Sequence, residues 1–199
     1  MGNEAIGRGI VECGCSVAAS YPGTPASEIL EAVVAFARET GRGMHVEWSV
    51  NEKVAYEVAL AASYTGKRAA VAMKQVGLNV ASDPLMSAAY SGVRGGFLVV
   101  SADDPGPHSS QTEQDSRLMA MLAKVPVLDP DSPAQARELV AAGFGLSERF
   151  AVPVMIRPTT RVCHACQDIL PGDVLPRDEK ADFVKEPLQH LNHLAESLA

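Results

Sequence analysis

The stretch HVEWSVNEKVAYEVA, residues 45–59, predicts a short strand that runs directly into a helix. Residues 45–50 are typical of a strand, and from Asn51 the apolar side chains follow a mostly helical spacing. Glu52 therefore falls in the first turn of the helix. In an open α/β sheet, the carboxyl ends of the strands form the edge where ligands bind, and a carboxylate there can exchange a proton with a ligand.

A purely structural role for Glu52 is the alternative. Ser49 and Glu52 are three residues apart, as in a capping box, in which the glutamate bonds back to the backbone of the capping residue. Taken alone, the spacing favours the capping box, so the rest of the chain has to decide between the two roles.

Strands and helices alternate along the chain, which predicts a parallel sheet with helices on both faces. Strands are expected at 15–21, 45–50, 68–73, 96–101, 125–128 and 152–157, and helices at 2–14, 25–38, from 51 onward, through 86–90, and from 132 toward 150. Thr24 and Ser132 are expected to be N-caps, because each precedes a proline suited to the first helical position. Residues 74–79 are expected to form a polar loop. Pro153 predicts that the last strand begins at this residue or lies at an edge of the sheet.

The composition fits one ordinary domain with a sizeable core and an appendage. Hydrophobic residues make up 47% of the 199 residues and aromatic residues 5%, as expected for helices packed on a parallel sheet of small aliphatic side chains. Residues 1–160 are expected to form this domain. Residues 161–199 are expected to form an interdomain linker and, beyond residue 187, a short amphipathic helix with leucines at helical spacing.

Charge and motifs argue against several classes of function. A net charge of −7 without a basic stripe excludes a nucleic-acid partner. No apolar run approaches ~20 residues, so no membrane span is expected, and the absence of a signal-peptide pattern at Met1–Glu4 favours a cytoplasmic location. Gly7-x-Gly9 lies in a helix that precedes a strand and lacks the third glycine of a dinucleotide site. Neither a phosphate-binding loop nor a Gly-x-Ser-x-Gly elbow is present.

Cys163 and Cys166 form a Cys-x-x-Cys pair, a spacing that can bind metal or support redox chemistry. Zinc or an iron–sulfur cluster would need two further ligands, and the spacing of Cys13 and Cys15 is unsuitable. We therefore expect four ordinary thiols and no metal site.

Two further segments bring polar groups to the same predicted edge of the sheet. In YPGTP, residues 21–25, Gly23 allows a ligand to approach the backbone closely and Thr24 offers a hydroxyl. Residues 102–117 are the most polar segment, contain His108, and follow an apolar strand, which favours a ligand-binding loop. A well-capped helix and a merely solvated loop are the structural alternatives.

Five blocks of sequence resemble a known family: GNEA at 2–5, YPGTP at 21–25, EWSVNEK at 47–53, MKQVGLNV at 73–80 and DDPGPHSSQ at 103–111. Together they resemble the amino-terminal, pyrimidine-binding domain of the indolepyruvate:ferredoxin oxidoreductase alpha subunit, within the thiamine-diphosphate 2-oxoacid:ferredoxin oxidoreductase family. The resemblance covers roughly residues 2–164. It implies an α/β fold with a flavodoxin-like open parallel sheet and helices on both faces.

The resemblance also implies roles for individual residues. Glu52 would hydrogen-bond N1′ of the cofactor's aminopyrimidine, and protonation of N1′ favours the imino form at N4′ that removes the proton from thiazolium C2. This role makes capping the less favoured interpretation of Glu52. Thr24 would lie near the substrate's carboxylate or carbonyl, and His108 would face the substrate. The implied catalytic residues are Glu52, Thr24 and His108, and the implied cofactor-binding residues are Glu52, Gly77, Asn79 and Gly23.

The sequence lacks two other parts of the family. It contains neither the Gly-Asp-Gly segment that binds magnesium and the diphosphate nor the repeated Cys-x-x-Cys-x-x-Cys of the iron–sulfur module. We therefore expect an excised domain or an incomplete subunit, inactive alone, that shares thiamine diphosphate with a diphosphate-binding domain or subunit. Mg²⁺ and 4Fe-4S clusters are expected only in the rest of the enzyme.

In the intact enzyme, an arylpyruvate such as indolepyruvate and coenzyme A would give an aryl-acetyl-CoA, carbon dioxide and reduced ferredoxin. A beta subunit and ferredoxin are the implied partners, and a homodimer is expected. Two alternatives stay open. One is the alpha subunit of a non-oxidative thiamine-dependent decarboxylase of the sulfopyruvate or phosphonopyruvate type, and the other is a non-catalytic flavodoxin-like binding module.

Overall fold

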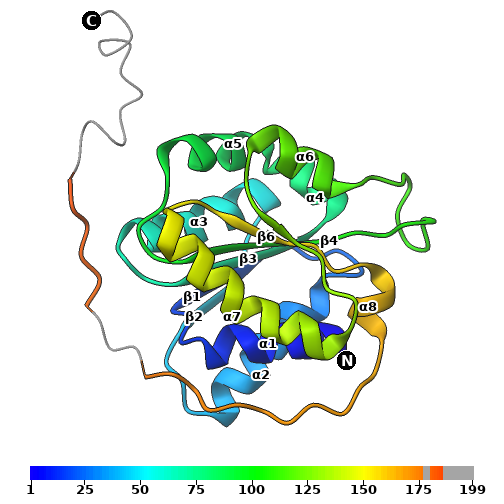
Figure 1. The fold of residues 1–199 in the computed structure, drawn as a ribbon, viewed down its shortest axis with the longest axis horizontal. Helices are drawn as coiled ribbons and strands as arrows, with labels where there is room; N and C mark the ends of the chain where they lie inside the picture. Colours follow the sequence, from blue (N-terminus) through cyan, green and yellow to red (C-terminus); the bar gives the residue numbers. More distant parts are fainter. Residues whose placement is uncertain (177–179, 186–199) are drawn as a thin grey trace, which may run out of the picture.

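A six-stranded parallel sheet forms the centre of the computed structural model, which describes residues 1–176 and 180–185 (Figure 1). The strands lie in the order β2-β1-β3-β4-β6-β5, and all neighbouring pairs are parallel. Their bounds are β1 Val17–Ser20, β2 His45–Trp48, β3 Ala69–Lys74, β4 Phe97–Ala102, β5 Val127–Leu128 and β6 Val154–Ile156. The predicted open, flavodoxin-like parallel sheet is confirmed.

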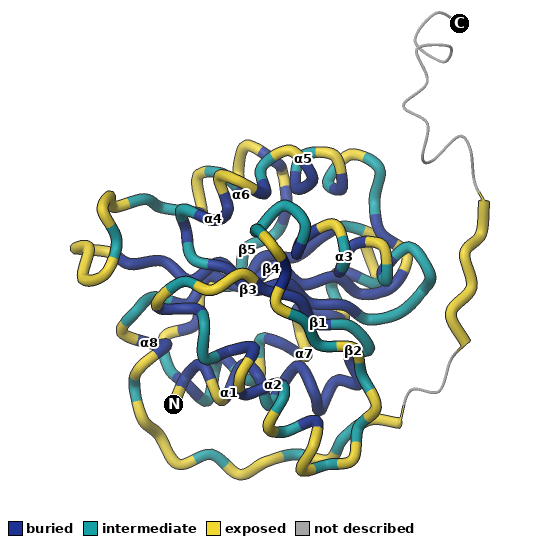
Figure 2. Tube along the Cα trace, turned by 180° about the vertical axis from the view of Figure 1, so that it is seen from behind, coloured by how far each residue is buried: buried dark blue, intermediate teal, exposed yellow. Residues whose placement is uncertain are grey.

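Helices cover both faces of the sheet, as predicted (Figure 1). On one face lie α1 (Gly2–Glu12), α2 (Ser27–Glu39), α7 (Pro133–Phe150) and α8 (Thr160–His164), and on the other α3 (Glu52–Tyr64), α4 (Gln75–Val80), α5 (Ser82–Ser91) and α6 (Ser116–Ala123). Leu98 and Val100 of β4 pack into the first layer, whereas Phe97 and Val99 pack into the second. Successive strand residues point to opposite faces, so a strand covered on both sides has to be apolar throughout. Figure 2 shows the strands buried between the two layers.

Three local expectations are wrong. Helix α2 begins at Ser27 rather than Pro25, because the chain first turns at Thr24, where the peptide bond to Pro25 is cis and the Ala26 N–H bonds to the Gly23 carbonyl at 2.7 Å. Thr24 is therefore not an N-cap. Residues 75–80 form helix α4 instead of a loop. Of the two positions expected for Pro153, an edge of the sheet is wrong, because β6 lies between β4 and β5; the start of the strand agrees within one residue, because β6 begins at Val154.

The chain that follows α8 is held against the domain by backbone contacts. Gly2 N–H bonds to the Ala165 carbonyl, and Glu12 accepts hydrogen bonds from Gly172 N–H at 2.6 Å and, through its backbone, from Leu175 N–H at 2.8 Å. The Asp182 N–H then bonds to the Thr65 carbonyl, which precedes β3. The helix expected beyond residue 187 lies outside the described residues.

A buried ion pair closes the end of β4. The carboxylate of Asp103 accepts hydrogen bonds from Arg157 Nε at 2.7 Å and from the hydroxyl of Ser116 at 2.7 Å. The Asp103 side chain is fully buried and that of Arg157 is 9% exposed. This pair joins β4 to the segment after β6 and to the start of α6.

Arg157→Met should destabilise the fold strongly, because it leaves the Asp103 carboxylate buried without its counter-charge. A loss of about 3–5 kcal/mol is expected in the free energy of unfolding, measured by urea denaturation. Arg161→Met, at an exposed position of α8, is the control and should change stability by less than about 0.5 kcal/mol. Equal effects of the two substitutions would contradict this role of the ion pair.

Candidate functional site at the carboxyl ends of the strands

Helix α3 is capped by Asn51 and not by Ser49. The Asn51 side chain accepts the Val54 N–H at 2.9 Å, and the Ser49 hydroxyl instead donates to Glu47 at 2.8 Å. The capping box between Ser49 and Glu52 is therefore absent. Among the described residues, the Glu52 carboxylate has no hydrogen-bond or ion-pair partner.

Glu52 lies directly over Gly77 of helix α4. A Cβ atom at Gly77 would be 2.5 Å from Glu52 Oε1 and 2.6 Å from Glu52 Cγ, so any larger residue would displace the glutamate. Gly77 is buried and Glu52 is half-buried. The structure thus brings together the strand-to-helix carboxylate and the predicted glycine, which come from segments that follow β2 and β3.

The loop after β1 meets both the end of β3 and the polar loop after β4. A Cβ atom at Gly23 would be 2.9 Å from Cδ of Lys74, the last residue of β3. Lys74 Nζ donates to the Ser109 carbonyl at 3.4 Å, and the Ser109 hydroxyl donates to the Thr24 carbonyl at 3.1 Å. Gly23 and Thr24 therefore lie beside the loop that carries His108.

Asp104 shapes the loop around His108. One oxygen of its buried carboxylate accepts the backbone N–H groups of His108, Ser109 and Ser110 at 3.0, 2.9 and 3.0 Å, and the other accepts the Thr160 hydroxyl at 2.8 Å. Burial by itself would raise the pKa of Asp104, but these hydrogen bonds outweigh it and hold the pKa well below its usual range. The His108 side chain, by contrast, is exposed.

Helix α4 also holds the polar loop through side-chain amides. Asn79 Nδ2 donates to Gln114 Oε1 at 2.8 Å, and Gln75 Nε2 donates to the Thr112 carbonyl at 3.4 Å. Asn79 is exposed, so the structure places it at the contact between α4 and the loop, two residues beyond Gly77.

Lys74 and Asp104 were not among the site residues predicted from sequence. Both lie in segments that the sequence does place at the strand ends: Lys74 closes β3, and Asp104 comes two residues after β4. Glu52 was selected because it follows the carboxyl end of a predicted strand, and the same criterion would have selected Lys74 and Asp104.

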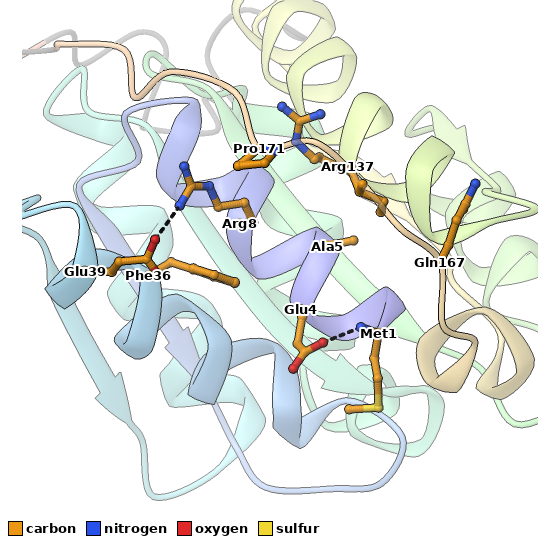
Figure 3. A pocket seen from close by; sticks show the side chains of 10 residues that line it. Met1, Glu4, Ala5, Arg8, Phe36, Glu39, Arg137, Gln167 and Pro171 are labelled. Atoms are coloured by element: carbon orange, nitrogen blue, oxygen red, sulfur yellow. Dashed lines mark hydrogen bonds and ion pairs between the residues drawn. The ribbon is translucent and has the colours of Figure 1, made fainter.

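A separate hollow of about 240 Å³ lies away from the strand ends, in the helical layer formed by α1, α2 and α7 and beside the chain after α8 (Figure 3). Its charged groups are paired: Arg8 bonds to Glu12 at 2.8 Å and lies 3.6 Å from Glu39, and Arg137 bonds to Glu12 at 2.7 Å. None of the predicted site residues lines it. It is lined by Met1, Glu4, Ala5, Arg8, Phe36, Glu39, Arg137, Gln167, Ile169 and Pro171.

The four cysteines are free thiols, of which Cys13, Cys15 and Cys163 are buried and Cys166 is exposed. Burial raises the pKa of the Cys15 thiol to about 12. Within residues 1–176 and 180–185, no three His, Cys, Asp or Glu side chains are grouped as metal ligands. None of the helices in this part of the chain has the length and apolar character needed to cross a bilayer.

The fold and its polar edge define a ligand-binding domain of the flavodoxin-like α/β class. Comparison with known proteins is more specific, because residues 8–198 match the family described as pyruvate flavodoxin/ferredoxin oxidoreductase, thiamine diphosphate-binding. The chain belongs to this family, as its resemblance predicted.

Curated relatives agree with this assignment. The chain is 46% identical over 198 residues to the indolepyruvate oxidoreductase subunit IorA of Thermococcus kodakarensis, an alignment that covers 96% of this chain and 30% of the relative. It is 52% identical over 167 residues to IorA of Archaeoglobus fulgidus, covering 83% of this chain and 27% of the relative. The chain thus spans about 30% of the length of these relatives.

A solved structure has the same fold. The 2-oxoglutarate:ferredoxin oxidoreductase from Magnetococcus marinus, with 2-oxoglutarate, coenzyme A and succinyl-CoA bound, superimposes with a TM-score of 0.72 and 26% identity. The match covers 81% of this chain and 29% of that one.

Asp104→Asn should loosen the His108 loop and reduce stability by about 1–3 kcal/mol at pH 7, because the amide binds the three N–H groups more weakly than a carboxylate. The folded-state pKa of Asp104 is lower than its ordinary pKa of 3.8. Its contribution to the free energy of unfolding is therefore fully present above pH 3.8 and is lost as the pH falls through the folded-state pKa. Urea denaturation at several pH values should therefore show the gap between wild type and variant closing only below that ordinary value. Asp168→Asn, at an exposed position, should leave the pH profile unchanged. A gap that stays constant down to acid unfolding would contradict the assignment.

Proposed function

We propose that this chain is the pyrimidine-binding domain of a thiamine diphosphate-dependent 2-oxoacid:ferredoxin oxidoreductase that acts on arylpyruvates such as indolepyruvate. The observation that carries the proposal is the Glu52 carboxylate, half-buried at a strand end, packed on Gly77 and without a partner among the described residues. A carboxylate in this state is available to a ligand, whereas a capping glutamate would already be occupied.

We place the aminopyrimidine ring of the cofactor beside Glu52 at this edge of the sheet. When bound, thiamine diphosphate supplies a nucleophilic carbon and a sink for the electrons released by decarboxylation. Glu52 would hold a proton at N1′ of the ring and so keep the ring in the state that activates this carbon. Gly77 leaves room for the glutamate, and Gly23 leaves room for the side chain of Lys74 at the end of β3.

The substrate would lie on the side of Thr24 and His108. The two segments meet through the hydrogen bond from Ser109 to the Thr24 carbonyl. Asp104 accepts the His108 backbone N–H and so fixes the backbone from which the exposed His108 side chain extends. The Thr24 hydroxyl would bind the carboxylate or carbonyl of the 2-oxoacid, and the His108 ring would face its reacting end. Asn79 would shape the pocket through its contact with the polar loop.

The remaining parts of the enzyme would come from outside this chain. We assign residues 1–160 to the pyrimidine-binding domain and 161–199 to its connection with the next domain. Trp48 and Val50, which flank the β2–α3 junction, are 43% and 79% exposed, and large apolar side chains beside a site favour cover by a partner. That partner would be the diphosphate-binding domain or subunit with its Mg²⁺.

The wider assembly would include a beta subunit, 4Fe-4S clusters, ferredoxin and coenzyme A, in a cytoplasmic homodimer whose isolated pyrimidine-binding domain is inactive. The similarity to oxidoreductase subunits favours this enzyme over a non-oxidative decarboxylase. The unpartnered Glu52 carboxylate argues against a non-catalytic module.

Glu52→Gln in the complete enzyme tests the proposal. The amide cannot exchange a proton with N1′, so kcat should fall by about 10²- to 10⁴-fold, and exchange of the C2 proton of bound cofactor, followed by NMR, should slow in parallel. Glu57→Gln, on the exposed face of the same helix, is the matched control and should leave both rates unchanged. Near-normal turnover of Glu52→Gln would refute the role assigned to the carboxylate.

Gly77→Ala tests whether activity depends on the position of Glu52 and not on the stability of the fold. The new Cβ displaces Glu52, so turnover of the complete enzyme should drop at least about tenfold although alanine favours the helix. Gly145→Ala in α7, where a Cβ meets no atom within 4 Å, should keep full activity and gain about 0.5–1 kcal/mol of stability in thermal unfolding. Full activity of Gly77→Ala would show that the contact with Glu52 does not matter.

A further inference from the structure

Lys74 contacts two of the segments that form the strand-end site, at Gly23 and at Ser109. It is the last residue of β3, pairs in register with Ala102 of β4, and is half-buried. Its aliphatic part lies along the backbone at Gly23, where a Cβ would be 2.9 Å from Cδ and 3.2 Å from Cγ. The side chain therefore passes between the loop that carries Thr24 and the loop that carries His108.

The ammonium group of Lys74 lacks a strong partner. Among the described residues its one hydrogen bond, to the Ser109 carbonyl, is 3.4 Å long, which is beyond the usual range for such a bond. Within residues 1–176 and 180–185, no carboxylate forms an ion pair with it.

Neighbouring cations at the strand ends differ in this respect. Lys53 lies 2.8 Å from Asp83. Arg117 lies 2.6 Å from Asp115, and Arg157 is paired with Asp103 as described above. These charges are neutralised within the chain, whereas that of Lys74 is available to an anion.

We propose that Lys74 binds the carboxylate of the 2-oxoacid substrate, an inference that rests on the proposed function. A 2-oxoacid is an anion at neutral pH, and a site that removes its carboxylate from water has to replace the lost hydration with charge or hydrogen bonds. Thr24 offers an uncharged hydroxyl and His108 an imidazole, whereas Lys74 carries an ammonium group. Lys74 lies between their two segments and supplies that charge.

The chemistry of decarboxylation decides which kinetic constant should respond. The negative charge of the carboxylate is dispersed as carbon dioxide leaves, so an ammonium group bound to it stabilises the substrate at least as well as the transition state. Such an interaction strengthens binding without raising kcat. Lys74 should therefore act on affinity and leave the chemical step largely to Glu52.

Lys74→Met in the complete enzyme tests the inference. The KM for the 2-oxoacid should rise at least about tenfold while kcat stays within about threefold, because a charged interaction made by the bound substrate is lost. Lys74→Arg should retain most of the affinity. Lys67→Met, just before the opposite end of β3, is the matched control and should behave as wild type.

A neutral analogue separates charge from shape. The amide of the same 2-oxoacid, used as a competitive inhibitor, has no carboxylate, so its inhibition constant should be the same within about twofold in wild type and in Lys74→Met. A KM unchanged by Lys74→Met would overturn the inference, and so would equal weakening of acid and amide, which would indicate a distorted pocket. Wild-type enzyme without any thiamine diphosphate-dependent turnover of 2-oxoacids would instead overturn the proposed function itself.

Discussion

Two adjacent carboxylates at the end of β4 hold the functional edge of the sheet together. Asp103 and Asp104 follow each other in an extended chain, so their side chains point to different sides. Asp103 binds Arg157 and the start of α6, whereas Asp104 gathers three successive N–H groups of the polar loop. The first contact fixes where the loop leaves the sheet, and the second fixes how it turns. The positions of His108 and Ser109, and through Ser109 the contact with Lys74, depend on both.

The order of the strands explains why the candidate site residues gather where they do. Strand β1 lies between β2 and β3, and the helices that follow β1 and β3 lie on opposite faces of the sheet. In open α/β sheets, ligands bind where neighbouring connections diverge in this way. Gly23 lies in the connection from β1 to α2, and Lys74 lies at the start of the connection from β3 to α4. The two residues are neighbours because these connections begin side by side and then turn to opposite faces of the sheet. Glu52 enters the same region from β2 because its helix packs beside α4.

The sequence predicted the parts of this arrangement that local signals encode. Strand β4 was predicted from the apolar run at residues 97–100, as expected for a strand covered on both faces, and Glu52 was placed correctly in the first turn of α3. The prediction that Thr24 is an N-cap was wrong because a threonine before a proline usually indicates a helix start. The observed turn is closed instead by the hydrogen bond from Ala26 N–H to the Gly23 carbonyl, which residue propensities do not predict. Helix α4 was not predicted because four of its six residues, Val76, Gly77, Asn79 and Val80, are poor helix formers. Leu78 is only 1% exposed, and its packing against the sheet stabilises the helix despite that preference. The roles of Asp104 and Lys74 required knowledge of which loops meet.

The path of the chain after α8 has a geometric consequence for assembly. This segment passes beneath α1 and reaches Thr65 at the amino-terminal edge of the sheet, on the far side of the domain from the polar loop (Figure 1). Asp182 is therefore separated from Glu52 and His108 by the length of the sheet. Residues 180–185 thus leave the carboxyl ends of the strands, with Glu52 and Lys74, uncovered.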